Sequence, residues 1–369
     1  MIPSVEEPLL ALRHKLHSPS KIRVGINGFG RIGRSIFRVA LLQSDLEVVA
    51  INHTCRSAHD VLHLIRYDST HGCLSKTRVA DFDVLDPQTL RIDGRHIALF
   101  SQRDPARLSW DTAGADYVVE CTGKLTTLAQ ASLHISEAGA KRVFISAPSA
   151  DAPTFVYGVN LDRFDSSTKV VSCASCTTNC LAPIVKILDE EYGLEQGLMT
   201  TVHASTQSQQ VLDGYSMRDR RAGTNFSFPI RRSVLGNVIP TTTGAAQAIS
   251  KVLPRVAGRL TGISLRVPIT NVSLVDLTVN LKTATTLPSL LNKLRHASKT
   301  YLNGVLQVCD EELVSCDFLG NPHSAIIDVK MCLELNSNFY KIVAWYDNEW
   351  GYSSRLLDIV RFVAGKDVC

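Results

Sequence analysis

The feature that most constrains this chain is the glycine-rich segment GFGRIG at residues 28–33, which stands between a β-rich run and a helical pattern. Gly28 permits a tight turn, Gly30 lets the backbone approach a pyrophosphate, and Gly33 lets a helix pack close to a sheet. The free N–H groups and the positive dipole at the start of the helix attract phosphate groups. Glycines alone would indicate only a turn, but in this context the segment predicts a dinucleotide-binding site.

The first half of the chain alternates short apolar runs with helical patterns. Strands are expected at 21–27, 46–52, 116–120 and 141–145, helices at 34–42 and 58–67, and a hairpin turn at Asp93-Gly94. Strands that alternate with helices form parallel βαβ units, so this half is expected to be an open α/β sheet.

The second half has a different pattern, in which long strands dominate. Helices are expected at 176–192, 287–297 and 352–362, and strands at 198–204, 260–267, 272–281, 325–329 and 341–346. This order predicts an α+β domain with a mixed or antiparallel sheet. With 369 residues the chain is long enough for two such domains.

A histidine occupies the position that distinguishes NAD from NADP in dinucleotide-binding turns. In NAD-binding turns an acidic residue about 20 residues after the glycines accepts the ribose 2′-hydroxyl. Here the second strand ends in Asn52-His53-Thr54, so His53 occupies that position, although a histidine there is also typical of a surface strand end. An imidazole does not repel the 2′-phosphate of NADP, and it attracts that phosphate when protonated. Acceptance of NADP alongside NAD is therefore predicted.

A cysteine and a histidine form the second candidate centre. Cys176 stands where coil becomes helix, and a helix N-terminus or a nearby imidazole lowers the pKa of a thiol. His203 ends a later strand, where its imidazole could face that thiol. Together they would form a nucleophile–base pair, whereas separately they would be a small buried apolar residue and an ordinary core histidine.

Several classes of protein are disfavoured by composition. A formal charge of +4 without a clustered basic face gives no support for nucleic-acid binding. No apolar run approaches the roughly 18 residues that a membrane span needs. Ten cysteines in a long chain without a signal-like segment favour reduced thiols and a cytoplasmic location. Cys173 and Cys176 have zinc-like spacing but lack a second pair, so no metal is expected.

Long motifs across the chain resemble those of the phosphorylating glyceraldehyde-3-phosphate dehydrogenases, from Lys21 to about Val363. They are INGFGRIGR at 26–34, YDSTHG at 67–72, SAPSADAP at 146–153, ASCTTNCLAP at 174–183, TTVHA at 200–204, TTTGAA at 241–246, RVP at 266–268 and WYDNEWGYS at 345–353. The resemblance implies a Rossmann domain, an α+β catalytic domain and a homotetramer. It places an NAD(P)-binding domain at 21–175 and 348–369 and a catalytic domain at 176–347, after an extension at 1–20 that is expected to be mobile.

The resemblance also assigns roles to single residues. Cys176 would attack the aldehyde and His203 would take the proton, so that hydride transfer leaves a thioester that inorganic phosphate converts to 1,3-bisphosphoglycerate. The residues implied to bind the substrate's phosphate and the attacking phosphate are Ser175, Thr177, Thr206, Arg232, Thr243, Gly244 and Arg266. Those implied to bind the cofactor are Gly28, Gly30, Arg31, Ile32, Gly33, His53, Arg103, Thr122, Gly123, Ser146 and Asn348.

The sequence departs from the family pattern in places, and two other functions stay open. The segment 214–237 is longer than its counterpart, Tyr215 stands where proline is frequent, and Cys173 replaces an asparagine. An erythrose-4-phosphate dehydrogenase is one alternative, although the hydroxyl of Thr206 favours glyceraldehyde 3-phosphate. A non-catalytic NAD(P)-binding regulatory protein is the other.

Overall fold

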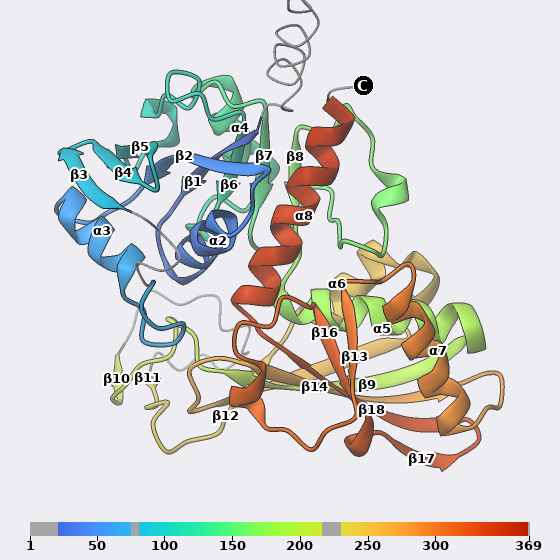
Figure 1. Ribbon diagram of the computed structural model, residues 1–369. Helices are drawn as coiled ribbons and strands as arrows, with labels where there is room; N and C mark the ends of the chain where they lie inside the picture. The colour runs from blue at the N-terminus through green and yellow to red at the C-terminus, as the bar shows by residue number, and fades with distance from the viewer. Residues whose placement is uncertain (1–20, 75–80, 216–229, 368–369) are drawn as a thin grey trace, which may run out of the picture.

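The computed structural model describes residues 21–74, 81–215 and 230–367, which form two eight-stranded sheets with helices around them (Figure 1). The expectation of a mobile extension at 1–20 lies outside the described residues. No helix in the described part of the chain is long and apolar enough to cross a membrane.

The first sheet is parallel through most of its width. Its strand order is β3-β4-β5-β2-β1-β6-β7-β8, and only the β3-β4-β5 edge is antiparallel. The strands are β1 (Ile22–Asn27), β2 (Leu46–Asn52), β3 (Phe82–Asp86), β4 (Thr89–Ile92), β5 (Arg95–Phe100), β6 (Tyr117–Glu120), β7 (Arg142–Ile145) and β8 (Val170–Ser172). The predicted hairpin turn at Asp93-Gly94 joins β4 to β5.

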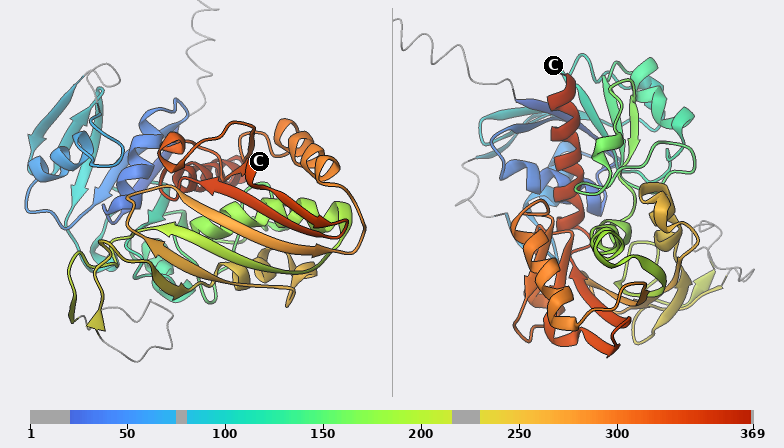
Figure 2. Two further views of the ribbon diagram at one scale, coloured as in Figure 1. Left: turned by 90° about the horizontal axis from the view of Figure 1, so that it is seen from below. Right: turned by 90° about the vertical axis from the view of Figure 1, so that its right-hand side faces the viewer.

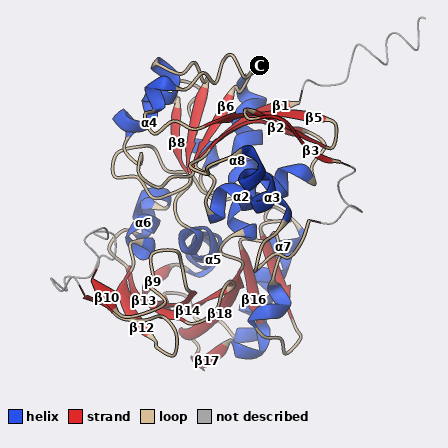
Figure 3. Cartoon of the chain, turned by 90° about the vertical axis from the view of Figure 1, so that its left-hand side faces the viewer, coloured by secondary structure: helices blue, strands red, loops and turns tan. Residues whose placement is uncertain are grey.

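Helices cover both faces of this sheet, which explains why its central strands carry apolar residues at successive positions. They are α2 (Arg31–Leu41), α3 (Ala58–Arg66), α4 (Leu128–Ser136) and α8 (Trp350–Asp367). Val119 packs into the core shared with α2, α3 and α8, while its neighbour Val118 packs into the core on the α4 side. Figure 3 shows α4 on one side of the sheet and α2, α3 and α8 on the other. Adjacent residues of a strand face opposite ways, so a sheet covered on both faces needs continuous apolar runs.

The second sheet is mixed and is covered by helices on one face. Its order is β12-β13-β9-β14-β18-β16-β15, with β17 paired to β18. The strands are β9 (Leu194–Ala204), β12 (Ile239–Thr242), β13 (Leu260–Val267), β14 (Ser273–Leu281), β15 (Leu306–Cys309), β16 (Ala325–Asp328), β17 (Leu333–Asn336) and β18 (Phe339–Tyr346); a separate ribbon pairs β10 (Gly214–Tyr215) with β11 (Ile230–Arg231). Burial along β14 alternates at every residue, as expected for a sheet with one buried face.

Three helices lie against the buried face of this sheet and form its core with it. They are α5 (Cys176–Tyr192), α6 (Ala245–Val252) and α7 (Leu287–Lys299). In the left view of Figure 2 the strands lie in front of α5 and α6, and no helix of the described residues covers the opposite, bare face of the sheet. The short 3-10 turns are Pro105–Arg107, Leu161–Arg163, Pro254–Val256, Ser315–Phe318 and Val329–Met331.

The chain returns at its end to the first sheet. Leu356, Ile359 and Val360 of α8 belong to the core that α2 and α3 share, and Arg142 at the start of β7 forms an ion pair with Asp367. The two sheets confirm the predicted fold class, an α/β Rossmann-type domain plus an α+β domain with a mixed sheet. The exact domain boundaries stay a prediction.

Candidate active site

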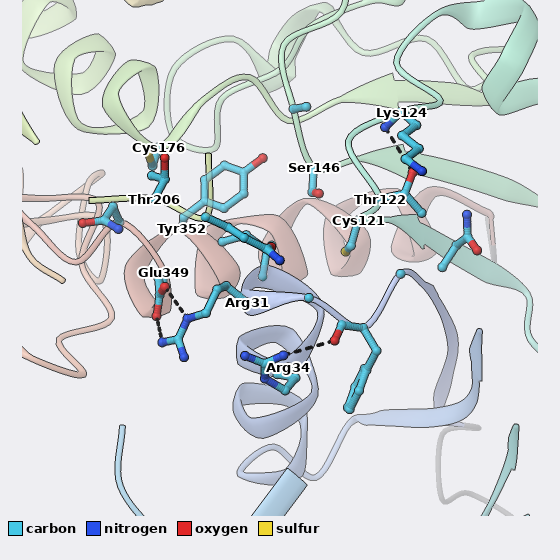
Figure 4. A pocket seen from close by; sticks show the side chains of 18 of the residues that line it. Arg31, Arg34, Cys121, Thr122, Lys124, Ser146, Cys176, Thr206, Glu349 and Tyr352 are labelled. Atoms are coloured by element: carbon cyan, nitrogen blue, oxygen red, sulfur yellow. Dashed lines mark hydrogen bonds and ion pairs between the residues drawn. The ribbon is translucent and has the colours of Figure 1, made fainter. Parts of the chain in front are cut away.

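A cleft of about 1590 Å³ lies where the carboxyl ends of β1, β2, β6 and β7 face the residues of the second sheet. Fourteen of the predicted site residues line it: Gly28, Gly30, Arg31, Ile32, His53, Arg103, Thr122, Ser146, Ser175, Cys176, His203, Thr206, Arg266 and Asn348. Figure 4 shows how they are distributed, with Cys176 and Thr206 on one side and Thr122 and Ser146 on the other. A crevice outside the carboxyl ends of parallel strands is where α/β sheets bind their ligands.

The three glycines of the first motif differ in what surrounds them. Gly28 has a φ of +96°, and a Cβ there would lie 2.8 Å from the backbone nitrogen of Thr122. A Cβ on Gly33 would lie 2.2 Å from the carbonyl oxygen of Gly28. A Cβ on Gly30 would meet nothing nearer than Gln207 Oε1, at 4.0 Å. Gly28 and Gly33 are therefore required by the turn itself, whereas Gly30 keeps open a space at the start of α2.

The start of α2 offers the donors that a pyrophosphate needs. Gly30 is its N-cap and supplies no side-chain hydrogen bond, so the first backbone N–H groups of the helix have no cap from that residue. Gly28, Gly30 and Ile32 all line the cleft here. The open space at Gly30 and the uncapped start of α2 fit the phosphates of a dinucleotide.

The Arg31 side chain connects elements instead of pointing freely at a ligand. Its Nε donates to Glu349 at 2.8 Å (Figure 4), and its Nη1 donates to Asp68 at 2.5 Å. Burial alone would raise the pKa of Asp68, but the backbone N–H groups of His71 and Thr70 and the guanidinium of Arg31 lower it to about 2. Sequence reasoning missed Asp68 and Glu349, although both lie within quoted motifs.

His53 is a buried wall of the cleft and not a surface side chain. It follows β2 directly, and only 6% of its surface is exposed. Its Nδ1 accepts the backbone N–H of Cys55 at 3.0 Å, and burial lowers its pKa. Because Nδ1 is an acceptor, the proton of the neutral ring is on Nε2. The ring is thus a hydrogen-bond donor, and its buried position disfavours the charged form.

A chain of buried polar groups joins the strand ends below the cofactor side of the cleft. Glu120 accepts hydrogen bonds from Asn27 and from the backbone and hydroxyl of Thr122, and its carboxylate lies 3.2 Å from His134 Nε2. Asn27 in turn accepts from Asn52 at 2.7 Å. Sequence reasoning missed Asn27, Asn52, Glu120 and His134, of which the first three end predicted strands. The hydrogen bonds hold the ends of β1, β2 and β6 in register where the cleft opens.

Cys176 and His203 come together from a helix and a strand. Cys176 is the first residue of α5, where Ser175 is the N-cap and its hydroxyl accepts from the backbone of Thr178 at 3.0 Å. His203 is near the carboxyl end of β9, and its Nε2 lies 3.5 Å from Cys176 Sγ. The predicted pair is therefore in contact.

The other nitrogen of His203 has two competing partners. Nδ1 lies 2.7 Å from the carbonyl oxygen of Ala204, which only accepts, and 2.6 Å from Nη1 of Arg266, which only donates. The strand register explains this contact, because Arg266 on β13 is directly beside His203. When Nδ1 is protonated it donates to Ala204 and leaves a lone pair on Nε2, which then faces the thiol.

Both reactive groups are held in their neutral forms in this environment. Burial, and then the positive charge of Arg266, lower the pKa of His203 to about 3. Burial raises the pKa of Cys176, an effect that Arg266 and hydrogen bonds of Thr177 partly oppose. A neutral imidazole beside a thiol is able to accept its proton as the thiol reacts.

Some predicted residues lie away from the lining of the cleft. The hydroxyl of Thr177 is buried and bonded to Tyr346, and Arg232 is exposed and forms an ion pair with Asp213 at 2.9 Å. Four more do not line the cleft: Gly33, Gly123, Thr243 and Gly244. The roles of all these residues stay predictions. Residues 216–229, most of the longer segment, lie outside the described residues.

Two predicted residues have partners that orient them. Thr206 donates both its backbone N–H and its hydroxyl to Gln209 Oε1, at 2.7 and 2.8 Å. Asn348 Oδ1 accepts from the hydroxyl of Ser273 at 2.7 Å, which fixes the amide at the cleft. No group of three or more His, Cys, Asp or Glu side chains in the described ranges is placed to hold a metal ion.

Comparison with known proteins gives matches over both sheets. The family model glyceraldehyde 3-phosphate dehydrogenase, NAD binding domain, matches residues 22–128, and the model for the C-terminal domain of the same enzyme matches 175–348. Similar proteins include a chloroplastic glyceraldehyde-3-phosphate dehydrogenase of Arabidopsis thaliana, 47% identical over 94% of this chain and 79% of its own. Glyceraldehyde-3-phosphate dehydrogenases of Schizophyllum commune and Schizosaccharomyces pombe are each 47% identical over 94% of this chain and 98% of theirs.

Proposed function

The chain belongs to the glyceraldehyde-3-phosphate dehydrogenase family, and we propose that it oxidises glyceraldehyde 3-phosphate reversibly to 1,3-bisphosphoglycerate. The observation that carries this proposal is the 3.5 Å separation of Cys176 Sγ and His203 Nε2 in the same cleft as the dinucleotide turn. The predicted family resemblance is confirmed by the matches.

Covalent chemistry falls to Cys176 and His203. The thiol of Cys176 adds to the aldehyde carbon as His203 Nε2 takes its proton and passes it to the former aldehyde oxygen, which gives a thiohemiacetal and leaves His203 neutral. The dinucleotide, when bound, supplies the hydride acceptor. Loss of hydride from the former aldehyde carbon and of the hydroxyl proton to His203 converts the thiohemiacetal to a thioester. Inorganic phosphate then attacks the thioester, the acyl group moves to the phosphate, and Cys176 is released.

Arg266 and Thr206 are proposed to bind the phosphate of the substrate. The guanidinium of Arg266 lies in the cleft, and its Nε is buried without a partner among the described residues. A phosphate that draws Arg266 away from Nδ1 of His203 would favour the tautomer with Nδ1–H bonded to Ala204, in which Nε2 is the base. Ser175 lines the cleft beside the thiol and is proposed, with Thr243, Gly244 and Arg232, to serve the attacking phosphate.

Use of both NAD and NADP is proposed from the surroundings of His53. The NAD-binding domain is established by the family match, whereas the choice between cofactors rests on this position. His53 presents a donor and no negative charge, so it does not repel a 2′-phosphate. The lowered pKa of the ring favours recognition by hydrogen bonding over recognition by charge.

The substitution His53→Asp tests cofactor choice. It is expected to raise kcat/KM for NAD and to lower it for NADP, because a carboxylate accepts ribose hydroxyls and repels phosphate. Steady-state kinetics with both cofactors measure the change. A wild-type enzyme without turnover on NADP would contradict the proposal.

The proposed assembly is a homotetramer in the cytoplasm. Support for self-association comes from the bare face of the second sheet, where Leu198 and Ile263 are more than half exposed on neighbouring strands. Large exposed apolar groups on one face mark interaction surfaces. Light scattering after size-exclusion chromatography would give the mass directly, and a monomer at micromolar concentration would contradict the assembly.

A steady-state assay tests the proposed reaction. Reduction of NAD or NADP is followed with glyceraldehyde 3-phosphate, with and without inorganic phosphate, and with erythrose 4-phosphate as the competing aldehyde. We expect phosphate-dependent turnover that is faster with glyceraldehyde 3-phosphate. Faster turnover of the four-carbon sugar would favour the erythrose-4-phosphate alternative, and no turnover on either would favour a non-catalytic protein.

A further inference from the structure

Three buried hydroxyl groups meet beneath the catalytic pair. Tyr346 ends β18, and its hydroxyl oxygen lies 2.8 Å from Oγ1 of Thr177 and 2.8 Å from Oγ1 of Thr201. None of the three residues is more than 4% exposed. The hydroxyls thus satisfy one another, because each is both a donor and an acceptor.

The two threonines stand immediately beside the reactive residues. Thr177 follows Cys176 in the first turn of α5. Thr201 precedes His203 by two residues on β9, so the two side chains share one face of the sheet. The tyrosine hydroxyl therefore joins the start of the helix that carries the thiol to the strand that carries the imidazole.

The sheet explains why a residue as long as tyrosine is needed. β14 lies between β18 and β9 in the sheet. Tyr346 on β18 is opposite Ser273, the first residue of β14, and this end of β14 also lies beside the end of β9 that carries His203. From there the ring extends toward β9 and α5. Its plane is edge-on to the His203 ring, with 6.0 Å between the ring centroids.

We propose that Tyr346 is a positioning residue whose hydroxyl fixes the distance and orientation between Cys176 and His203. This inference rests on the proposed function, because it assigns Tyr346 a part in the same covalent chemistry. It also gives the Thr177 hydroxyl a role different from phosphate binding. A misplacement of about 1 Å between reacting groups can cost on the order of 100-fold in rate.

The environment of Tyr346 excludes a direct acid–base role. Burial, and then the nearby Cys176, raise its pKa far above the ordinary value. The hydroxyl consequently stays protonated throughout the neutral range and acts as a neutral hydrogen-bonding group. Its effect on the reaction is therefore transmitted through Thr177 and Thr201.

The variant Tyr346→Phe tests the proposal, because it removes one oxygen and keeps the ring. We expect kcat to fall roughly 10- to 100-fold while KM for substrate and cofactor stays within about twofold. Alkylation of Cys176 by iodoacetamide at pH 7 should slow as well, because the thiol loses its alignment with His203. This second measurement needs no turnover.

Tyr340→Phe is the matched control. Tyr340 is on the same strand, is 1% exposed, and donates its hydroxyl to the backbone oxygens of Thr285 or Ser337, at 2.7 and 2.8 Å. Removal of the Tyr340 hydroxyl breaks a buried hydrogen bond, as removal of the Tyr346 hydroxyl does, but at a place far from the thiol. We expect it to lower Tm without changing the alkylation rate of Cys176.

Thr201 supplies an independent arm of the test. Thr201→Val should reproduce the kinetic loss of Tyr346→Phe, Thr201→Ser should recover most of the rate, and the double variant Tyr346→Phe with Thr201→Val should lose little more than either alone. Such non-additivity is expected when two groups act through one contact.

The outcomes separate this inference from the proposed function. An alkylation rate and kcat in Tyr346→Phe equal to wild type would overturn the inference, as would an equal loss in Tyr340→Phe. Absence of aldehyde oxidation in the wild type would instead remove the proposed reaction. In that case, alkylation of Cys176 that is slower in Tyr346→Phe but unchanged in Tyr340→Phe would still support the positioning of the thiol by Tyr346.

Discussion

The two sheets of this protein deliver residues to one cleft in different ways. The first sheet lines the cleft with residues that directly follow its strands: the turn at 28–33 follows β1, His53 follows β2 and Thr122 follows β6. The second presents side chains from within elements, with His203 and Arg266 as neighbours on adjacent strands.

The difference lies in how far apart the cooperating residues are in the sequence. The residues of the glycine turn are consecutive in the sequence. The backbone conformation that the turn requires is therefore visible in the residue types of one short segment. The thiol and the imidazole are separated by helix α5 and strand β9, and only tertiary packing brings them to 3.5 Å. Binding by the first sheet and reaction on the second should therefore be separable by mutation.

Cys176→Ser is expected to have the largest effect and to separate the two regions completely. Phosphorylating activity should vanish, because a serine hydroxyl is not ionised at neutral pH, whereas the Kd for NAD should stay within about twofold. Turnover and cofactor titration measure the two quantities. Cys316→Ser, an exposed cysteine, is the control and should retain full activity. Loss of NAD binding in Cys176→Ser would show that the regions are not separable.

His203→Asn should be the next largest change, again confined to the second sheet. The rate is expected to fall on the order of 10²- to 10⁴-fold, the usual worth of a positioned general base. Alkylation of Cys176 at pH 7 should slow because the thiol loses its proton acceptor. His296→Asn, at an exposed position of α7, should change neither rate. Unchanged alkylation in His203→Asn would contradict the pairing.

Gly33→Ala and Gly30→Ala compare two roles within the first region. A Cβ on residue 33 would overlap the oxygen of Gly28, so we expect a loss of about 1–3 kcal/mol in stability. A Cβ on residue 30 meets no close atom, so the fold should persist while the Kd for NAD rises at least about tenfold through obstruction of the pyrophosphate. Thermal unfolding and cofactor titration distinguish them. Unaltered NAD affinity in Gly30→Ala would argue against this location for the pyrophosphate.

Sequence alone predicted the fold class, the glycine turn and the proximity of Cys176 to His203, since each has a local pattern or a long motif. It underestimated β9, which begins at Leu194 and not at 198, and it missed the edge strands β12 and β15. Those segments become strands through pairing with neighbours distant in the chain, which overrides weak local preference. The contacts of Arg31 with Asp68 and Glu349 were likewise hidden, because spacing along the chain does not reveal ion pairs between separate elements.

Asp68→Asn should have the smallest effect and concerns how the loop after α3 is held to Arg31 of α2. The native pKa of Asp68 is about 2, below its unfolded value of roughly 3.9. The ionised carboxylate therefore stabilises the fold above about pH 4, and this contribution is lost as the pH falls toward 2. The variant should be less stable at pH 6 and should lose less stability on acidification. Denaturant unfolding at pH 6 and pH 3 measures both, and identical acid sensitivity in the two proteins would contradict the stabilising role of the ionised Asp68 carboxylate.

Detection of an acyl group on Cys176 tests the proposed covalent mechanism most directly. The enzyme is mixed with glyceraldehyde 3-phosphate and NAD in the absence of inorganic phosphate, quenched in acid, digested and examined by mass spectrometry. We predict a 3-phosphoglyceroyl thioester on the peptide that contains Cys176, formed together with one equivalent of reduced cofactor and removed on addition of phosphate. Reduced cofactor formed in that amount with Cys176 unmodified, or an acyl group on another residue, would contradict the role of Cys176 as the nucleophile.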